Sequence, residues 1–162
     1  VDDKYQAKKV IVDSKSTFTQ LNRRIDSNYL ELDLIKKEVY AKKNPVLTID
    51  DGPKGNTLVK ADDVTGYIDK ELIKLNKNVY VKNIDEKKEE TVLTADRGTV
   101  TKQMADVYDR VKIVTKDSVT TANEGHYDIV NRKIRAKGNV HVDYTSDKSA
   151  SSIFNDMIST KK

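Results

Sequence analysis

The chain has 162 residues, which is enough for one domain with a substantial core. It contains no cysteine, so disulfides, cysteine-ligated zinc sites and thiol nucleophiles are excluded. The apolar stretches are shorter than the about 20 residues that a membrane-spanning helix needs. The net charge is +4 with 30 Lys and Arg against 26 Asp and Glu, but the two signs alternate along the chain. Without a dense basic block and interleaved aromatics, we expect no nucleic-acid binding.

The chain begins with Val1 rather than methionine, so we expect a processed or trimmed product that lacks its targeting or anchoring segment. Residues 1–8 are interpreted as a lead segment, and an opening strand is predicted near residues 9–13. Residues 9–144 are predicted to form a single β domain. The remaining residues, 145–162, form a polar tail.

Four stretches after the opening strand form an internal repeat. Each has a polar anchor residue at its centre, and successive anchors are separated by 34, 32 and 29 residues. The stretches are residues 37–49, 71–83, 103–115 and 133–144, and their anchors are Asn44, Asn78, Arg110 and Asn139.

Apolar side chains keep the same parity on both sides of every anchor. Five and three residues before the anchors stand Val39, Ile73, Ala105, Ile134, Ala41, Leu75, Val107 and Ala136. One and three residues after them stand Pro45, Val79, Val111, Val140, Leu47, Val81, Ile113 and Val142. A period of two over about nine residues is typical of one half-buried strand and not of a helix.

The last repeat contains a Gly138-Asn139 pair, which could close a two-residue hairpin. A hairpin would reset the relation between the flanking apolar rows, whereas the parity is kept. The position of Gly138 is taken in the other repeats by Lys43, Lys77 and Asp109, which do not favour the positive φ of such a turn. We therefore predict a bend or bulge inside one long strand.

Turns are predicted upstream of the repeats, at residues 36–37, 69–70, 101–102 and 131–132. A partly alternating run precedes each turn, so each repeat is predicted to be a unit of two antiparallel strands. Four units and the opening strand give about nine or ten strands. Without helices between the units, the sequence predicts an all-β antiparallel body: a jelly roll, a sandwich or a coiled stack of strands.

The tail differs in character from the β domain, because it is rich in serine and lysine. Ile153, Phe154, Met157 and Ile158 are spaced as one face of a short helix. A disordered tail and a packed cap are both open at this point, with a partner-binding helix as a third interpretation.

Side chains that carry chemistry are sparse. His126 and His141 are the only histidines, and neither stands in a recognised metal-binding spacing with Glu124 or Asp128. The acidic pairs at residues 50–51 and 62–63 fit turns and strand ends rather than a calcium loop. No phosphate-binding loop or nucleophile motif occurs. We therefore expect no catalytic residues, no metal and no cofactor.

The repeat resembles the periplasmic lipopolysaccharide-transport proteins of the OstA-like family, which include LptC and LptA. The shared pattern is Ala-Asp, a tyrosine-containing strand and an alternating strand ending in Gly-Asn-Val-x-Val. Its carriers here are Ala122-Asn123, Tyr127 and residues 137–142, echoed by Ala61-Asp62, Tyr67 and residues 78–81. The likeness covers roughly residues 8–144, with departures at Arg110 and Pro45. Residues 44–62 are more similar to LptC than to LptA.

The resemblance implies a twisted β-jelly roll, or open two-layer sandwich, around an apolar groove that carries the acyl chains of lipopolysaccharide. The lining expected from it is Ile73, Leu75, Val79, Val81, Val107, Val111, Ile113, Ile134, Val140 and Val142. The expected docking edges are Val10, Ile11 and Val12 in the first strand and Val140, His141, Val142, Asp143 and Tyr144 in the last.

The implied partners are lipopolysaccharide, other Lpt bridge proteins and an inner-membrane ABC transporter, with end-to-end pairing of identical copies as a further expectation. The implied location is the periplasm, with a tether to the inner membrane by a segment preceding Val1. Two alternatives remain open. One is a structural or adhesive β-repeat module with a closed core. The other is a carbohydrate-active enzyme that uses carboxylates such as Asp62 or Asp128.

Overall fold

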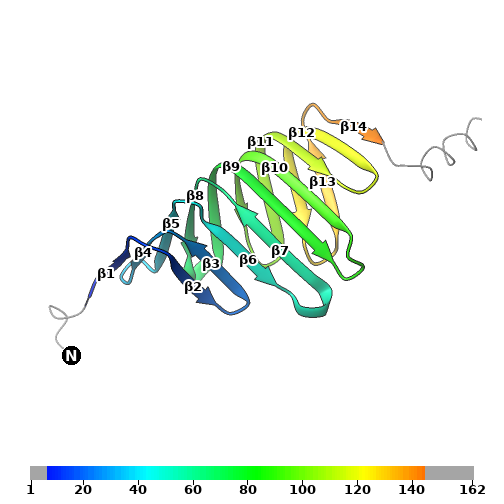
Figure 1. Ribbon diagram of the computed structural model, residues 1–162. Coiled ribbons are helices and arrows are strands. Elements are labelled where there is room, and N and C mark those ends of the chain that lie inside the picture. The colour runs from blue at the N-terminus through cyan, green and yellow to red at the C-terminus, as the bar shows by residue number, and fades with distance from the viewer. Residues whose placement is uncertain (1–6, 145–162) are drawn as a thin grey trace, which may run out of the picture.

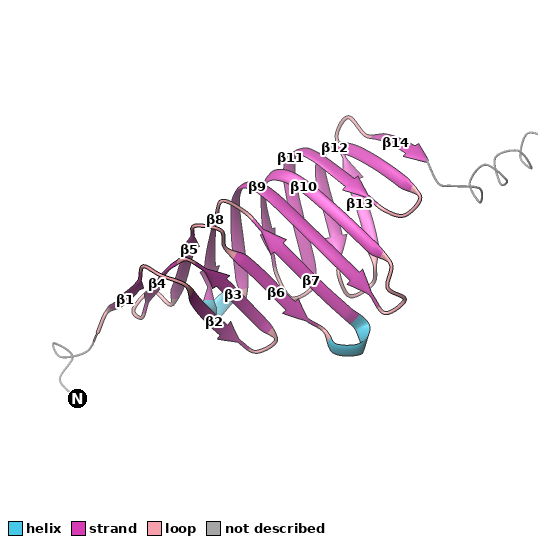
Figure 2. Ribbon diagram, in the orientation of Figure 1, coloured by secondary structure: helices cyan, strands magenta, loops and turns pink. Residues whose placement is uncertain are grey.

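The computed structural model describes residues 7–144 and shows an all-β antiparallel chain of fourteen strands. The first seven strands are β1 (Lys9–Val12), β2 (Ser16–Gln20), β3 (Arg23–Ser27), β4 (Tyr29–Asp33), β5 (Glu38–Lys42), β6 (Val46–Asp50) and β7 (Gly55–Lys60). The others are β8 (Asp63–Tyr67), β9 (Leu72–Asp85), β10 (Glu90–Val100), β11 (Met104–Val114), β12 (Ser118–Asp128), β13 (Lys133–Lys137) and β14 (His141–Tyr144). Strands dominate, and within residues 7–144 they are interrupted by two short 3₁₀ turns, η2 (Gly52–Lys54) and η3 (Ile68–Lys70) (Figure 2).

All fourteen strands join one continuous sheet, which bends along a line into two facing layers. We call this line the corner. The first layer contains β1, β4, β5, β8 and β13, and the second contains β2, β3, β6, β7 and β14. The long strands β9 to β12 pass through both layers, because one half pairs in each. We call each stretch of chain that crosses the corner from one layer to the other a pass. The described residues make nine passes, in agreement with the about nine or ten strands predicted from four two-stranded repeats and the opening strand.

The passes stack side by side along one axis, so β1 lies at one end of the molecule and β14 at the other (Figure 1). The chain reverses between passes at turns that lie away from the corner, among them residues 68–71, 101–103 and 129–132. The predicted turn positions are therefore confirmed. The two layers meet at the corner and diverge from it, so together they form a wedge. We call the open side of this wedge, where these turns gather, the mouth.

The bend at Gly138-Asn139 is confirmed, because β13 and β14 both pair with β12 and not with each other. The expectation that Lys43, Lys77 and Asp109 would not adopt a positive φ was wrong. Both residues at each of the four equivalent positions are left-handed: Lys43 and Asn44, Lys77 and Asn78, Asp109 and Arg110, and Gly138 and Asn139. Two successive left-handed residues turn the strand sharply without making it double back. The pair of left-handed residues, although energetically unfavourable, therefore forms the corner.

Polar side chains on the neighbouring pass hold these left-handed pairs. Arg110 donates three hydrogen bonds from Nε and Nη2 to the two carboxylate oxygens of Asp96, the shortest at 2.7 Å. This pairing holds the pKa of Asp96 below its usual range. In the preceding repeat, Asn78 Nδ2 donates to Asp62 Oδ1 at 3.0 Å. The Ala-Asp motif thus has a structural role at the corner, and Arg110 is a functional replacement for asparagine there.

The predicted parity places the apolar rows inside the wedge. In the first three repeats the inward positions are buried: Val39, Ala41, Pro45, Leu47, Ile73, Leu75, Val79, Val81, Ala105, Val107, Val111 and Ile113. All of them except Pro45 belong to one cluster that runs along the molecule between the layers. Burial of these aliphatic side chains is the main term that holds the two layers together.

Gly138 offers a direct test of the corner. Its φ is +80°, and an added Cβ would lie 2.9 Å from the Asn123 Cβ. We expect Gly138→Ala to lower the free energy of unfolding by about 2 kcal/mol, from left-handed strain together with this clash. Chemical denaturation followed by circular dichroism measures the change.

The matched control is Gly52→Ala, because Gly52 also has a positive φ but no atom within 4 Å of the added Cβ. We expect it to cost only about 1 kcal/mol, from strain alone. Equal losses in the two variants would contradict the close approach at the corner.

Candidate functional site

The candidate site is the interior between the two layers. Seven of the ten predicted lining residues are buried in its continuous apolar cluster: Ile73, Leu75, Val79, Val81, Val107, Val111 and Ile113. Strand pairing aligns them with equivalent residues of the neighbouring passes. One example is the row Ile25, Leu47, Val59, Val81, Leu93 and Ile113, which crosses the second layer. The interior is therefore a long aliphatic tract along the stack of strands.

The other three predicted lining residues lie on the last pass and are exposed. Ile134 is 38% exposed, Val140 47% and Val142 56%. Their parity is nevertheless inward, because Val142 pairs with Thr120, which pairs with the buried Ile113. The aliphatic tract thus continues to the final strand, where no further described strand covers it.

The interior changes from apolar to polar toward the mouth. In the second layer, the inward row nearest the mouth runs Arg23, Ile49, Thr57, Asn83 and Thr91. Arg23, Thr57 and Asn83 are buried polar groups, while the next row inward is wholly aliphatic. A buried polar group is stable only if its hydrogen bonds are made. Within residues 7–144 no buried side-chain nitrogen or oxygen lacks a partner.

Asn83 is the centre of a hydrogen-bonded cluster that joins the two layers. Its side chain is 2% exposed and donates to Thr57 Oγ1 at 2.8 Å within its own layer. From the first layer, the Tyr127 hydroxyl and Arg132 Nη1 donate to Asn83 Oδ1 at 2.9 and 2.6 Å. Arg132 Nη2 also donates to the carbonyl oxygen of Lys54. We call Asn83, Tyr127, Arg132 and the Lys54 carbonyl the Asn83 clasp.

A second clasp joins the layers nearer the amino-terminal end of the stack. Arg23 Nη1 donates to the Glu71 carbonyl oxygen at 3.0 Å, and Gln20 Nε2 donates to the Ile68 carbonyl oxygen at 3.4 Å. Burial lowers the pKa of the Arg23 guanidinium, while the charges of Glu71 and Asp51 act in the opposite direction. Gln20 and Arg23, with Glu71 and Ile68, form what we call the Arg23 clasp.

Both clasps depend on residues that the sequence interpretation missed. Asn83 falls on the same inward parity as Val79 and Val81, so a polar residue at that position was the available signal. Arg132 lies in a turn that was predicted correctly, but nothing in a single sequence indicates where its side chain points.

The interior between the layers is closed in this conformation. The cavity beside the Arg23 clasp measures about 20 Å³, which is room for about one water molecule. Ligand pockets for small molecules measure about 300–1,000 Å³. A hollow of about 300 Å³ lies at the mouth between the two layers, but a ligand among the aliphatic rows requires the layers to separate.

The predicted docking edges lie where the topology leaves strands without a second neighbour. β1 pairs only with β4 and β14 only with β12 among the described strands. Val10, Ile11, Val140 and Val142 are each more than 40% exposed, and His141, Asp143 and Tyr144 are also exposed, whereas Val12 is half-buried. The two strands belong to different layers, however. In a continuous stack, β1 would meet β13 of the next copy, and β14 would meet β2.

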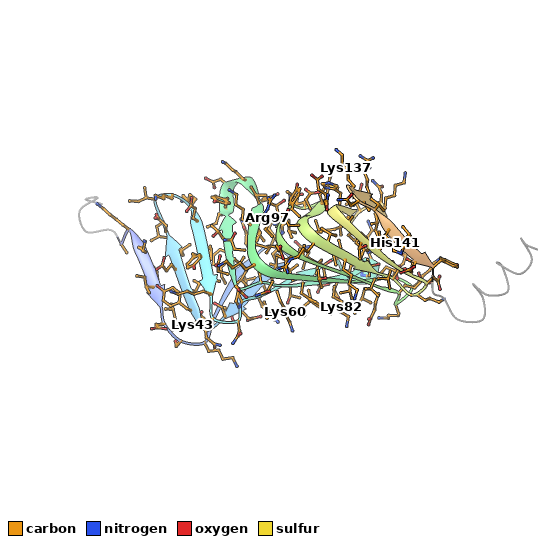
Figure 3. All side chains as sticks on the ribbon, turned by 90° about the horizontal axis from the view of Figure 1, so that it is seen from above. Lys43, Lys60, Lys82, Arg97, Lys137 and His141 are labelled. Carbon is orange, nitrogen blue, oxygen red and sulfur yellow. The ribbon has the colours of Figure 1, made fainter. Side chains whose placement is uncertain are left out.

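Most charged side chains lie on the outer faces, whereas Arg23 is buried between the layers. Lys43, Lys60 and Lys82 lie in a row along one side of the molecule (Figure 3). His126 Nδ1 lies 2.7 Å from Asp106 Oδ1, and its Nε2 lies 3.2 Å from Glu124 Oε2.

The two nitrogens of the His126 ring therefore face different carboxylates rather than one shared point. His126 and His141 lie in different layers, so they are not brought together. No cluster of three or more potential metal ligands occurs within residues 7–144.

Comparison with solved structures supports the architecture. The fold is similar to that of LptH, described as the LptA-homologous periplasmic component of the conserved lipopolysaccharide transport device from Pseudomonas aeruginosa. The TM-score is 0.66 at 13% sequence identity, over 76% of this chain and 94% of LptH. The predicted β-jelly roll is therefore confirmed.

No curated protein sequence matches the chain. Within the described residues, no helix has the length and apolar character needed to cross a membrane. The family model described as "Lipopolysaccharide-assembly, LptC-related" matches residues 4–145, which is most of the chain. The chain therefore belongs to the LptC-related family of lipopolysaccharide-assembly proteins.

Proposed function

We propose that this protein is a non-enzymatic periplasmic bridge component, which holds the acyl chains of lipopolysaccharide between its two layers. In this proposal it receives the lipid from an inner-membrane ABC transporter and passes it toward the outer membrane. The observation that carries the proposal is the aliphatic tract, which runs the length of the stack and stays inward-facing through Val142. Membership of the LptC-related family supports the same substrate.

The change from aliphatic side chains in the interior to polar side chains at the mouth suits an amphipathic lipid. Acyl chains would contact the aliphatic rows, which keeps apolar surface out of water. The polar headgroup would stay at the mouth, where Lys54, Lys102 and Arg132 line one hollow together with Asp51 and Glu86. Basic side chains there are suited to phosphate groups of the lipid, since charge-assisted hydrogen bonds are strong.

A closed-core β-repeat module that works through its surface is the second candidate. The filled interior favours it, because the cavity of about 20 Å³ holds no acyl chain. The two candidates differ in one respect that an experiment resolves. A lipid carrier must expose the inward row to lipid, whereas a closed module keeps that row in contact with protein only.

Two neighbouring residues of β14 provide the test of the lipid site. A photo-crosslinking amino acid at Val142 would face the interior, and the same residue at His141 would face outward on the adjacent position. We expect Val142 to capture purified lipopolysaccharide on irradiation and His141 to capture little. Capture at neither position, or equally at both, would contradict binding in the interior.

End-to-end association makes a separate prediction. Because β14 would meet β2 of the next copy, cysteines at Asp143 of one sample and Thr19 of another would come close on the outer face. We expect a short bismaleimide to link a mixture of the Asp143→Cys and Thr19→Cys proteins into a dimer, detected by gel electrophoresis. The chain has no native cysteine to interfere.

The control for this experiment replaces Asp143→Cys with Lys112→Cys. Lys112 also faces outward, but β11 has a partner strand on both sides and is not an edge. Equal yields of linked dimer from the two mixtures would indicate random collision and would contradict pairing of the edges.

A further inference from the structure

Away from the corner, few hydrogen bonds connect the two layers. Among the described residues there are five, and all lie at the mouth. Three belong to the Asn83 clasp and two to the Arg23 clasp. Elsewhere the layers meet through aliphatic side chains. The mouth is therefore fastened at two points rather than by continuous strand pairing.

The proposed lipid ligand cannot occupy the closed interior without a change in the protein. Entry from the side requires the layers to separate at the mouth. The strand pairing within each layer need not break, because its hydrogen bonds lie within the layers and the corner keeps them joined. The bonds that must break are those of a clasp.

The Asn83 clasp has the features of a contact that opens and closes. Its donors Tyr127 and Arg132 come from one layer, and its acceptors, Asn83 Oδ1 and the Lys54 carbonyl, come from the other. Arg132 belongs to the turn at residues 129–132, on the rim of the mouth, beside the exposed Val130. When these groups separate, water can replace each partner, so the net cost of each bond is modest.

We propose that the Asn83 clasp is a latch on the mouth, and that acyl chains enter sideways between the layers when Tyr127 and Arg132 release Asn83. The apolar rows beneath the latch then exchange contacts with each other for contacts with the acyl chains. This inference rests on the proposed lipid-carrying function, and it adds the route of entry and the residues that control it.

Cross-linking across the mouth tests the latch. Lys54 and Val130 line the same hollow from opposite layers, and neither side chain donates a bond to the clasp. In a Lys54→Cys, Val130→Cys protein, a short bismaleimide would fasten the mouth permanently. The matched control is Lys54→Cys, Glu86→Cys, because Glu86 lines the same hollow but lies in the same layer as Lys54.

We expect linking to weaken the binding of purified lipopolysaccharide by the 54–130 protein at least tenfold relative to the same protein before linking. Linking should leave the binding of the 54–86 control, which carries the same Lys54→Cys change, as it was before linking. Full binding by the linked 54–130 protein would overturn the latch and leave the proposed function standing. Failure of the protein with its native Lys54, Glu86 and Val130 to bind lipopolysaccharide would overturn the proposed function, and the latch with it.

A milder variant tests the same contact without a cross-link. Tyr127→Phe removes one donor to Asn83 while Arg132 still occupies the acceptor, so the buried amide keeps a partner. One hydrogen bond corresponds to about a fivefold change in the opening equilibrium. We therefore expect lipopolysaccharide to associate about fivefold faster by stopped-flow fluorescence. Tyr40→Phe, on the outer face, is the control and should leave the rate unchanged. An unchanged or slower rate in Tyr127→Phe would overturn the latch.

Discussion

The whole architecture depends on one backbone constraint: each strand must change layers without changing which side chains face inward. Two successive left-handed residues make this change in four of the nine passes. Such residues are individually unfavourable, so the neighbouring pass stabilises them through contacts such as Arg110 with Asp96 and Asn78 with Asp62. Because the parity survives the bend, the aliphatic rows of both layers face the same wedge, and a continuous apolar interior follows.

The same wedge geometry sets the chemistry of the interior. Side chains near the corner are enclosed on two sides and are aliphatic, whereas those near the mouth meet the turns and water and include Arg23, Thr57 and Asn83. Buried polar groups require partners, and the opposite layer supplies them through Tyr127 and the Glu71 carbonyl. A molecule with an apolar tail and a charged head matches this order of surroundings, which links the fold to the lipid that its family handles.

The sequence was sufficient for the repeat, the strand parity, the turns and the layered all-β body, because each depends on local periodicity. It was insufficient for the corner conformation, since Lys43, Lys77 and Asp109 are not residues that normally favour a positive φ. The clasps were also missed. The Asn83 clasp, for example, joins Asn83 to Arg132, which lies 49 residues further along the chain. Such a contact depends on how the two layers face one another. Likewise, only the topology reveals that β1 and β14 lie in different layers.

The proposed transport requires the two layers to separate and admit acyl chains between them. Spin labels at positions 54 and 130 report the width of the mouth by pulsed electron–electron double resonance. Labels at positions 54 and 86 report a distance within one layer. We expect purified lipopolysaccharide to shift the 54–130 distance to longer values and to leave the 54–86 distance unchanged. A 54–130 distance that stays the same when lipopolysaccharide is bound would contradict it.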